Sequence, residues 1–406
     1  MLNSKGKREL AYIVKIDDIQ PITGSDNCES AVVGGWHIMT RKGTFDQGDV
    51  AVYFEIDSLL DTTKPEFAFM EKYHGKVKTQ KFTFGGKGNF ISQGLLMHPN
   101  DFGWNVQTDN TVVDNNGGFH KEEDESRFLT DLLDVHYYDP ADEQRKKPQR
   151  AKQPVMPKFF YHGIGRKLMG IKWLKKILVF LFGKKVKVKQ FPYWVVKTDE
   201  ERIENLPHLF PGDNTEWIAT EKIDGTSTTF TLRKFKKKRE FYVCSRNVVF
   251  NSDKQKCYYD TNVYTEMADK YDLEYKMNKM LDNLLNKNVE FITIQGETYG
   301  GNIQKRNYGH EHRLAIFNVI FGYNDGVVKR LNPIEMKHEM DIYELPTVPI
   351  VDEHYKIPAT IEEMKAISGG VSKIDGGMRE GLVFRTYDGV RSFKSVDNDY
   401  LVKYHS

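Results

Sequence analysis

Cysteine is scarce in this chain, which has three, Cys28, Cys244 and Cys257, among 406 residues. They form no CxxC pair and are too few for a disulfide framework, which favours a reducing compartment, the cytoplasm or the nucleus. Long apolar runs are also missing, since the longest, residues 177–182, is far shorter than the roughly 20 residues that cross a bilayer. The basic start, MLNSKGKREL, lacks the apolar segment of a secretory signal. The sequence therefore predicts an intracellular protein without a transmembrane segment.

Net charge is small as well, at +2, so any attraction for nucleic acid must come from where the charges lie. Residues 144–189 hold fifteen Lys or Arg and no Asp or Glu, with aromatic residues between them. Three interpretations of this basic stretch remain open. It is a linker that follows phosphates and offers aromatic platforms to bases, a solvated tether, or an amphipathic helix at 166–182 that lies on a membrane surface or on the core.

Short strands are predicted throughout the first hundred or so residues. In VAVYFEI, residues 50–56, apolar Val50, Val52, Phe54 and Ile56 alternate with other side chains, which is typical of a half-buried strand. Glycine-rich turns separate the strands. Several short strands in about 100 residues indicate a small barrel, of which the OB type is the commonest that binds nucleic acid.

Strands return after residue 191, among them WIATEK, TSTTFTLR, EFYVCSR, VEFITIQGE, RLAIFNVIF and EGLVFRT. One helix is predicted at residues 263–287, where a methionine and leucine stripe repeats at helical spacing and is expected to be core: Met277, Met280, Leu281 and Leu284. The expected fold class is α+β. Its parts are an OB-like β-barrel (1–115), a basic linker or insertion (116–190) and an antiparallel-rich domain (191–406).

The stretch TEKIDGTS, residues 220–227, places Lys222 between Glu221 and an Asp224-Gly225 turn. The turn follows an apolar strand, so the ammonium should project from a strand end into a cleft. An amine is a useful nucleophile only when it is deprotonated. Burial lowers the pKa of a lysine and neighbouring carboxylates raise it, so activation requires a bound cation or phosphate-binding residues. Alone, the pattern is weak, and an ordinary turn lysine explains it better.

Further charged or aromatic residues follow within later strands or at their ends. They are Ser245-Arg246-Asn247, Glu297 in IQGETYGG, Phe317 in LAIFNV, Glu380 in REGLVFR and Lys394 in SFKSVDNDYLVK. Each has a plain explanation by itself, such as an exposed edge glutamate or a core phenylalanine. Together and in this order they predict a single pocket.

This series resembles motifs I, Ia, III, IIIa, IV and V of the covalent nucleotidyltransferases, the superfamily of ATP-dependent DNA and RNA ligases and mRNA capping enzymes. The resemblance covers roughly residues 191–406 and implies an ATP-grasp-like ligase domain. It implies that Lys222 attacks the α-phosphate of ATP and forms a lysyl-AMP phosphoramidate. AMP would then pass to a 5′-phosphate end, and a 3′-OH would displace it to seal the strand.

The resemblance also implies roles for the acidic residues. Asp224, Glu297 and Glu380 would hold a divalent ion, Mn²⁺ or Mg²⁺, partly through waters. Binding the ribose hydroxyls is an alternative role for Glu297. Asp224 would belong to the catalytic group together with Lys222.

Further implied roles concern the nucleotide. Phe317 would stack on adenine, whose amino group would be read by the backbone or the carboxylate of Glu221. Arg246 and Lys394 would bind the phosphates and take part in catalysis. The last motif often reads Lys-x-Lys, but here Ser392 stands at its first position, after Arg391. Lys394 would therefore act alone, or Arg391 would share its task.

The order of the domains indicates which family of the superfamily the sequence resembles. Twelve residues follow Lys394, which leaves no room for the OB domain that DNA ligases and capping enzymes carry there. An OB-like segment before the lysine resembles the fifth family of RNA ligases, as do NFISQGLLMHP and FPYWVVKTDEERIENLP. Arg202, in the latter segment, is a candidate for a further ATP phosphate contact. A surface helix capped by Thr198 or Asp199 is the alternative there.

The resemblance implies an ATP-dependent RNA ligase that acts in RNA repair as a monomer. The expected substrate is a nicked duplex of RNA, or of RNA and DNA, with an RNA strand supplying the 3′-OH. Two alternatives stay open. One is a catalytically idle RNA-binding protein with a ligase fold, and the other is a nucleotidyltransferase that modifies ends without joining them.

Overall fold

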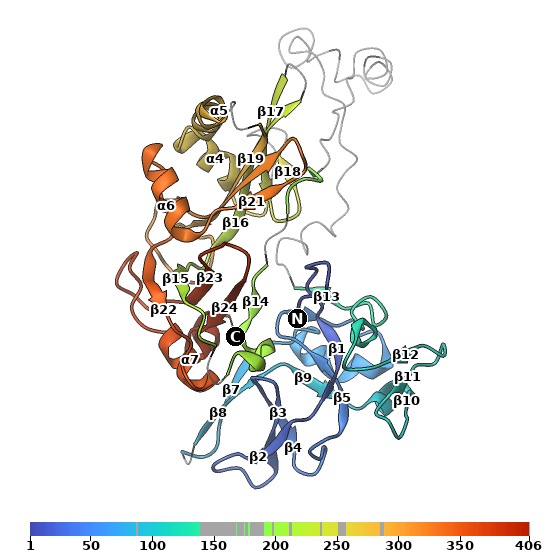
Figure 1. The fold of residues 1–406 in the computed structure, drawn as a ribbon. Helices are drawn as coiled ribbons and strands as arrows, with labels where there is room; N and C mark the ends of the chain where they lie inside the picture. Colours follow the sequence, from blue (N-terminus) through green and yellow to red (C-terminus); the bar gives the residue numbers. More distant parts are fainter. Residues whose placement is uncertain are drawn as a thin grey trace.

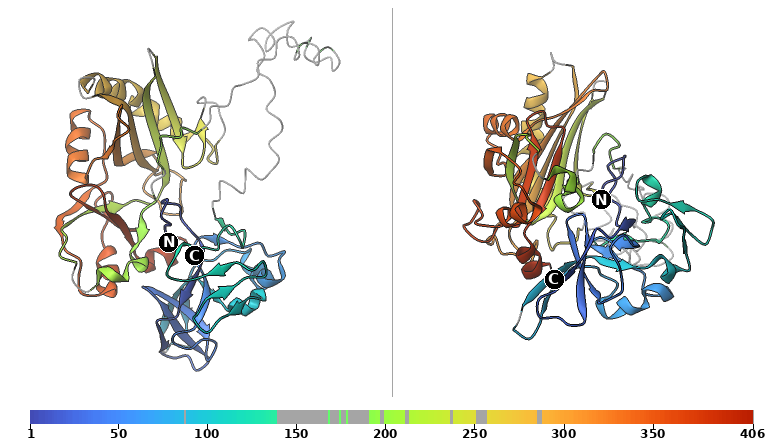
Figure 2. Two further views of the ribbon diagram at one scale, coloured as in Figure 1. Left: turned by 45° about the vertical axis from the view of Figure 1, so that its right-hand side comes forward. Right: turned by 60° about the horizontal axis from the view of Figure 1, so that its bottom comes forward.

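The computed structural model describes residues 1–86, 88–138, 168, 174, 178, 191–196, 199–210, 213–235, 238–250, 257–284 and 288–405. Figure 1 shows two parts, with the strands of the N-terminal residues below and the sheets and helices of the C-terminal residues above. Both chain ends lie where the two parts meet (Figures 1 and 2). No helix among the described residues is long and apolar enough to cross a membrane. The basic stretch 144–189 lies outside the described residues, apart from Leu168, Leu174 and Leu178.

The N-terminal part is built from short strands and 3-10 helices. The strands are β1 (Ala11–Lys15), β2 (Asp18–Pro21), β3 (Cys28–Val33), β4 (Trp36–Arg41), β5 (Val50–Phe54), β6 (Ser58–Leu59), β7 (Thr79–Thr83), β8 (Asn89–Gln93), β9 (Leu95–Met97), β10 (Asn105–Val106), β11 (Val112–Val113), β12 (Phe119–His120) and β13 (His136–Tyr137), and the 3-10 helices are η1 (Pro65–Tyr73), η2 (Pro99–Phe102) and η3 (Glu125–Arg127). They pair in the orders β1-β5-β9, β2-β3-β4, β7-β8, β10-β11-β12 and β13-β6. Among the described residues, these sheets do not close into one barrel by strand pairing. The last strand, β13, lies beyond the boundary expected at residue 115, which stays a prediction.

Strand β5 differs from the half-buried strand that its alternating pattern predicts. All five of its residues are buried. Val50, Val52 and Phe54 face one hydrophobic cluster, whereas Ala51 and Tyr53 face a second one. The expectation of one solvated face was wrong because the N-terminal part has packed layers on both sides of this strand.

The C-terminal part contains two sheets that are antiparallel with one exception. A five-stranded sheet has the order β14-β24-β23-β15-β22 and a six-stranded sheet the order β18-β17-β16-β19-β20-β21. Only β14 and β24 pair in parallel within these sheets, so the expected antiparallel-rich α+β class is confirmed. The strands are β14 (Glu201–Arg202), β15 (Trp217–Lys222), β16 (Thr226–Phe235), β17 (Lys238–Ser245), β18 (Val249–Phe250), β19 (Val289–Tyr299), β20 (Arg313–Tyr323), β21 (Val328–Arg330), β22 (Ile350–Tyr355), β23 (Gly381–Thr386) and β24 (Ser392–Val396).

The single helix predicted at residues 263–287 is two helices, so that prediction was wrong in its continuity. Helix α4 (Val263–Lys270) and helix α5 (Leu273–Asn283) are separated by Asp272, which has a left-handed backbone with φ of 50°. A non-glycine residue in that conformation cannot continue a right-handed helix. The other helices, which the strand-dominated prediction did not include, are α6 (Pro333–Ile342), α7 (Ile361–Ser368) and α8 (Asn398–Tyr404), and two short 3-10 helices are η5 (Ile203–Asn205) and η6 (Pro207–Leu209).

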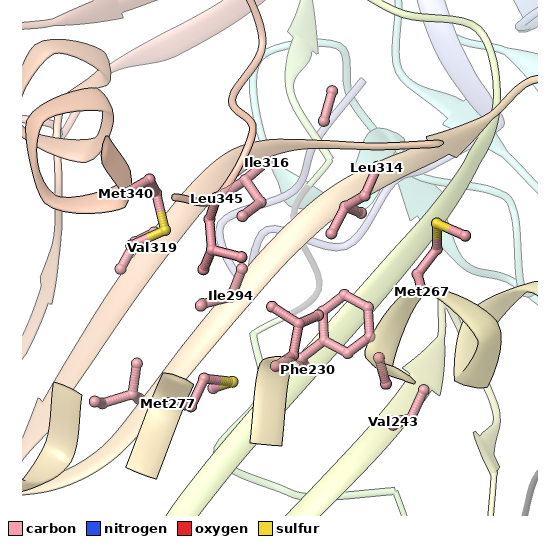
Figure 3. Packing of buried hydrophobic residues seen from close by; sticks show 14 of the residues in the cluster. Phe230, Val243, Met267, Met277, Ile294, Leu314, Ile316, Val319, Met340 and Leu345 are labelled. Atoms are coloured by element: carbon pink, nitrogen blue, oxygen red, sulfur yellow. The ribbon is translucent and has the colours of Figure 1, made fainter. Parts of the chain in front are cut away.

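The largest core lies between the six-stranded sheet and helices α4, α5 and α6. Figure 3 shows Phe230 and Ile294 from the sheet packed near Met277, with Met340 from α6 across the same cluster. Met277, Met280 and Leu281 are fully buried, and Leu284 packs against them from a partly buried position. The stripe is therefore core, as the sequence predicts. This core holds β16 and β19 rigidly, and these strands lead to the site described below.

Helix α8 and strand β14 lie at the junction of the two parts and lead to the site described below. Helix α8 and the strand before it reach the N-terminal part, because Val396 and Leu401 belong to the same hydrophobic cluster as Trp36 and Ile38. Arg202 lies in strand β14 and is buried, so the alternative of a surface helix at this point was wrong. A strand forms there because β24 offers a free edge to pair with.

Candidate active site

Lys222 is the last residue of β15, where it pairs with Gly381 of β23. The turn behind it packs tightly, since a Cβ added to Gly225 would lie 2.3 Å from the carbonyl oxygen of Thr298. Only glycine fits against the neighbouring strand at that distance. The Asp-Gly turn thus fixes the strand end, and the Lys222 Nζ lies 2.6 Å from Oε1 of Glu380.

Three carboxylates surround the Lys222 ammonium. Glu380 directly precedes β23, Glu297 lies in β19, and Asp224 is in the turn. Although burial acts to lower the pKa of Lys222, attraction to Glu380 and Glu297 outweighs it and raises that pKa above its ordinary value. Burial also raises the pKa of Glu297 to about 8, with only partial relief from Lys222. Without a ligand, the geometry therefore keeps Lys222 protonated and disfavours ionised Glu297.

Asp224 is held by the C-terminal helix. Its Oδ2 accepts a hydrogen bond from Tyr400 Oη at 2.9 Å and lies 3.1 Å from His405 Nε2. Burial acts to raise the pKa of Asp224, but the contact with His405 outweighs it and keeps this pKa below its usual value. Asp224 is thus a fixed carboxylate whose position depends on α8.

The donor set at this position fits a divalent metal ion. Ligand atoms of Asp224, Glu380 and His405 all lie within 4.8 Å of one another. Oε2 of Glu380 is buried and has no hydrogen-bond partner among the described residues. A buried carboxylate oxygen without a donor is the kind of atom that a cation satisfies. The predicted ligands were Asp224, Glu297 and Glu380. In the structure His405 takes the place of Glu297 in this group, and Glu297 lies beside it.

A second group of charges gathers on the carboxylate of Asp199. Lys394 Nζ lies 2.6 Å from it, Arg246 Nη2 lies 2.8 Å from it, and Arg8 Nη1 lies at 3.7 Å. Burial lowers the pKa of Lys394 to about 8, against the opposing attraction of Asp199. We call these four residues the Asp199 cluster. It draws together β24, the end of β17 and the N-terminal segment.

The two groups adjoin, because Arg246 is close enough to Glu297 to act on its pKa. One side of the site thus carries carboxylates around an amine, and the other carries three cations around one carboxylate. A phosphorylated substrate with a bound metal ion fits both halves. The metal ion offsets the negative charge of the carboxylates, and the phosphates offset the positive charge of the cations.

Comparisons with known proteins match this arrangement. A sequence model described as RNA ligase matches residues 215–405, and a model of an OB-fold domain matches residues 10–98. The structure resembles Naegleria gruberi RNA ligase with PPi at 26% identity and a TM-score of 0.65, covering 98% of this chain and 99% of that chain. Residues 215–405 therefore match the RNA ligase family, behind an OB-fold domain.

Other structures of the Naegleria gruberi RNA ligase resemble the present structure to the same extent. A variant with ATP and Mn and another with AMP and Mn each have 26% identity and a TM-score of 0.65, covering 98% of this chain and 99% of theirs. None of the curated proteins matches the chain. The OB-fold domain before a nucleotidyltransferase domain is therefore the architecture of this ligase, as the resemblance implied.

Other residues predicted for the ligase site have different surroundings. The Glu221 carboxylate accepts a hydrogen bond from the backbone N–H of Lys373 at 2.8 Å and another from the hydroxyl of Ser372. Phe317 lies at an irregularity in the pairing of β19 and β20, partly buried against the core. Its contact with adenine stays a prediction, as does the reading of the base by Glu221.

Arg202 lies in β14, which pairs with β24, and Arg391 directly precedes β24. The Arg202 Nη2 lies 3.4 Å from Asp57, and its Nε and Nη1 have no hydrogen-bond partner among the described residues. Its backbone pairs with Lys394, which places it next to the Asp199 cluster. Arg391 instead donates a hydrogen bond to Thr215 at 2.6 Å. Lys394 is therefore the cation of its segment that meets Asp199.

Sequence reasoning did not identify four residues that the ligase places in this site. They are Arg8, Asp199, Tyr400 and His405. A weak signal was present, since Asp199 precedes the buried Arg202 by three residues and His405 follows motif V closely. Only the packing of α8 and the N-terminal segment at the junction brings them to the nucleophile.

Proposed function

We propose that this chain is an ATP-dependent RNA ligase that seals 3′-OH and 5′-phosphate ends at nicks in duplexes, through lysyl-AMP and 5′-adenylylated strand intermediates. The observation that carries the proposal is the position of Lys222, whose Nζ lies 2.6 Å from Glu380 with further carboxylates around it. The three cysteines form no disulfide bond in the part of the chain that the structure describes, which fits a reducing compartment. Its substrate is an RNA or RNA/DNA duplex, and it works as a monomer.

In the first step, the lone pair of Lys222 Nζ attacks the α-phosphorus of ATP. A nitrogen–phosphorus bond forms, the bond to the bridging oxygen breaks, and pyrophosphate leaves. The amine must first lose a proton, and Glu380 Oε1 is the nearest carboxylate oxygen to accept it. A divalent ion, Mn²⁺ or Mg²⁺, held by Asp224 and Glu380 with His405 or Glu297, would favour the neutral amine and offset the charge of the triphosphate.

The Asp199 cluster supplies the cations for the phosphates. Lys394 and Arg246 lie within 2.8 Å of one carboxylate, so both are positioned to share an anion of similar size. A phosphate that binds there competes with Asp199, because carboxylate and phosphate oxygens need the same donors. The cluster thus binds the triphosphate in the first step and the activated 5′-phosphate in the later ones.

The later steps require RNA at the same nucleophile. The 5′-phosphate of the strand attacks lysyl-AMP and releases Lys222, and the 3′-OH then attacks the adenylylated phosphate and releases AMP. The structural likeness to the Naegleria gruberi ligase extends over both domains and supports this assignment. The OB-fold domain is the natural platform for the duplex, since such domains bind nucleic acid.

A sealing assay tests the proposal. Wild-type protein with ATP and Mn²⁺ should join a nicked duplex whose 3′-OH strand is RNA, and versions with either strand exchanged for DNA locate the sugar requirement. Lys222→Ala should abolish joining, whereas Lys329→Ala, at an exposed lysine paired with Glu335, should not. Transfer of AMP to ends without joining would favour an end-modifying enzyme. RNA binding with no AMP transfer at all would favour an idle binding protein.

A further inference from the structure

The hairpin of β16 and β17, together with Tyr193 beside it, carries exposed aromatic rings next to cations, at the end remote from Lys222. Tyr193 has 82% of its surface exposed and Phe235 has 51%. The guanidinium of Arg233 lies 5.3 Å from the ring centre of Tyr193 and 5.9 Å from that of Phe235. Two lysines flank the tip, Lys234 and Lys238. We call these five residues the hairpin surface.

The rings have a built support rather than a chance arrangement. Arg233 donates a hydrogen bond to Tyr193 Oη at 2.9 Å, and Nε of the same guanidinium donates to Glu290 at 2.8 Å. The guanidinium of Arg233 also lies 4.5 Å from the ring centre of Trp194. The Nε1 of Trp194 donates a hydrogen bond to Thr231 Oγ1 at 3.1 Å. Arg233 is therefore a support whose charge Glu290 balances.

The net positive charge of the hairpin surface comes from its lysines. Lys234 and Lys238 are exposed and have no ion pair with any residue that the structure describes. Between them, the sequence adds two more lysines, Lys236 and Lys237, which lie outside the described residues. Unpaired lysines next to exposed rings are the combination that binds the phosphates and bases of a nucleic acid strand.

The hairpin surface shares a face of the sheet with the active site. Ser227 lies opposite Glu297, and Phe235 and Arg233 lie an even number of residues further along the same strand. Residues two apart on a strand point to one face, so Glu297, Arg233 and Phe235 all face away from helices α4 and α5. Eight residues at about 3.3 Å each put Phe235 roughly 26 Å along the strand from Ser227.

Described residues before and at Asp199 also make contacts between these two points. Val196 accepts a hydrogen bond from Gln295 Nε2 at 3.0 Å, midway along β19. Further on, Asp199 reaches Lys394 and Arg246. Tyr193 thus lies at the hairpin surface, Val196 lies beside the middle of β19, and Asp199 lies at the proposed phosphate-binding cations.

We infer that the hairpin surface binds unpaired nucleotides of the RNA substrate that flank the junction being sealed, with bases stacked on Tyr193 and Phe235 and phosphates at Lys234 and Lys238. The inference deepens the proposed function, on which it rests for the nature of the substrate. Bases within a duplex keep their faces covered by stacking, so exposed rings select a strand with unpaired bases. The ligase would then prefer junctions that carry a single-stranded RNA flank long enough to reach about 26 Å.

Binding of labelled RNA to the full chain, without ATP, tests this. Two nicked duplexes are compared. One carries an unpaired flank of about twelve nucleotides, which is within the site sizes of such surfaces, and the other carries a flank of about two nucleotides, which is below them. Wild-type protein should bind the long flank roughly 5- to 30-fold more tightly, as expected for one or two stacked bases. The double variant Tyr193→Ala with Phe235→Ala should bind both substrates alike, whereas Tyr193→Phe, which keeps the ring, should behave as wild type.

A second variant protects the test against misfolding. Lys234→Ala with Lys238→Ala removes exposed side chains without ion pairs, and should lower the dependence of log affinity on log salt by about 1.4 for the long flank. Phe119→Ala, at a ring 60% exposed in the N-terminal part, is the matched aromatic control. Equal affinity of the wild type and both double variants for the long flank would overturn the inference. Absence of joining with flank-dependent binding intact would instead contradict the proposed function alone.

Discussion

The carboxylate of Asp199 accepts a hydrogen bond from Lys394 at 2.6 Å, although Lys394 is the lysine expected to bind phosphate. Arg246, the second expected phosphate ligand, contacts the same carboxylate. The carboxylate of the chain itself thus occupies the position between these cations. Under the proposed function, the phosphates of ATP displace Asp199 or share the cations with it.

Replacing Asp199 by asparagine should therefore lower the KM for ATP several-fold, because the competing charge is gone. Asp199 raises the pKa of Lys394, which burial has lowered to about 8, so without it this pKa falls further. The measurement belongs at a pH well below 8, which favours the protonated form of Lys394. Asp213→Asn, at a carboxylate paired with Arg391, is the control. A higher KM for ATP in the Asp199 variant would mean that Asp199 supports the cations instead of competing with phosphate.

Glu297 predicts a pH-dependent stability. Its pKa is raised by burial from 4.5 to about 8, so between these values the folded protein keeps a proton that the unfolded chain releases. Stability from this group is present at low pH and is lost as the pH rises through about 8. Glu297→Gln should melt a few degrees higher than wild type at about pH 9 in the presence of a chelator, with the difference vanishing near pH 5. Equal melting temperatures across this range would show that Glu297 ionises normally.

The hydroxyl of Tyr400 should affect how the ligase uses its metal ion. Tyr400→Phe removes the hydrogen bond to Asp224 but keeps a ring of the same shape. We expect a several-fold higher Mn²⁺ concentration for half-maximal adenylylation with a similar maximal rate, measured by titrating Mn²⁺ at saturating ATP. Tyr404→Phe on the same helix is the matched control. An unchanged Mn²⁺ dependence would contradict a positioning role for Tyr400.

The strands and the turn after Lys222 were predictable because their signals are local, whereas the role of Lys222 as nucleophile came from the resemblance to a family. Lys222 sits at the end of an apolar strand before an Asp-Gly turn, and the tight contact of Gly225 with Thr298 explains why the turn needs glycine. Glu297 and Glu380 lie near the lysine as their positions in neighbouring strands suggested. Alternation and turn residues depend on a few adjacent side chains, which a sequence displays directly.

The features that were missed depend on packing between distant segments. Strand β5 has cores on both faces, which its alternation could not reveal. The break between α4 and α5 depends on the left-handed backbone of Asp272 within a continuous apolar pattern. Tyr400 and His405 meet Asp224 across more than 170 residues, and no local pattern marks such a contact. Arg8 reaches Asp199 only because the N-terminal segment lies at the junction of the domains.

The most direct test of the account is the intact mass of the purified protein after incubation with ATP and Mn²⁺, followed by mapping of the modified peptide. We predict a gain of one AMP, attached to Lys222, that disappears in Lys222→Ala and persists in Lys329→Ala. A protein that never gains this mass, or gains it at another side chain, would contradict the assignment of Lys222 as the nucleophile.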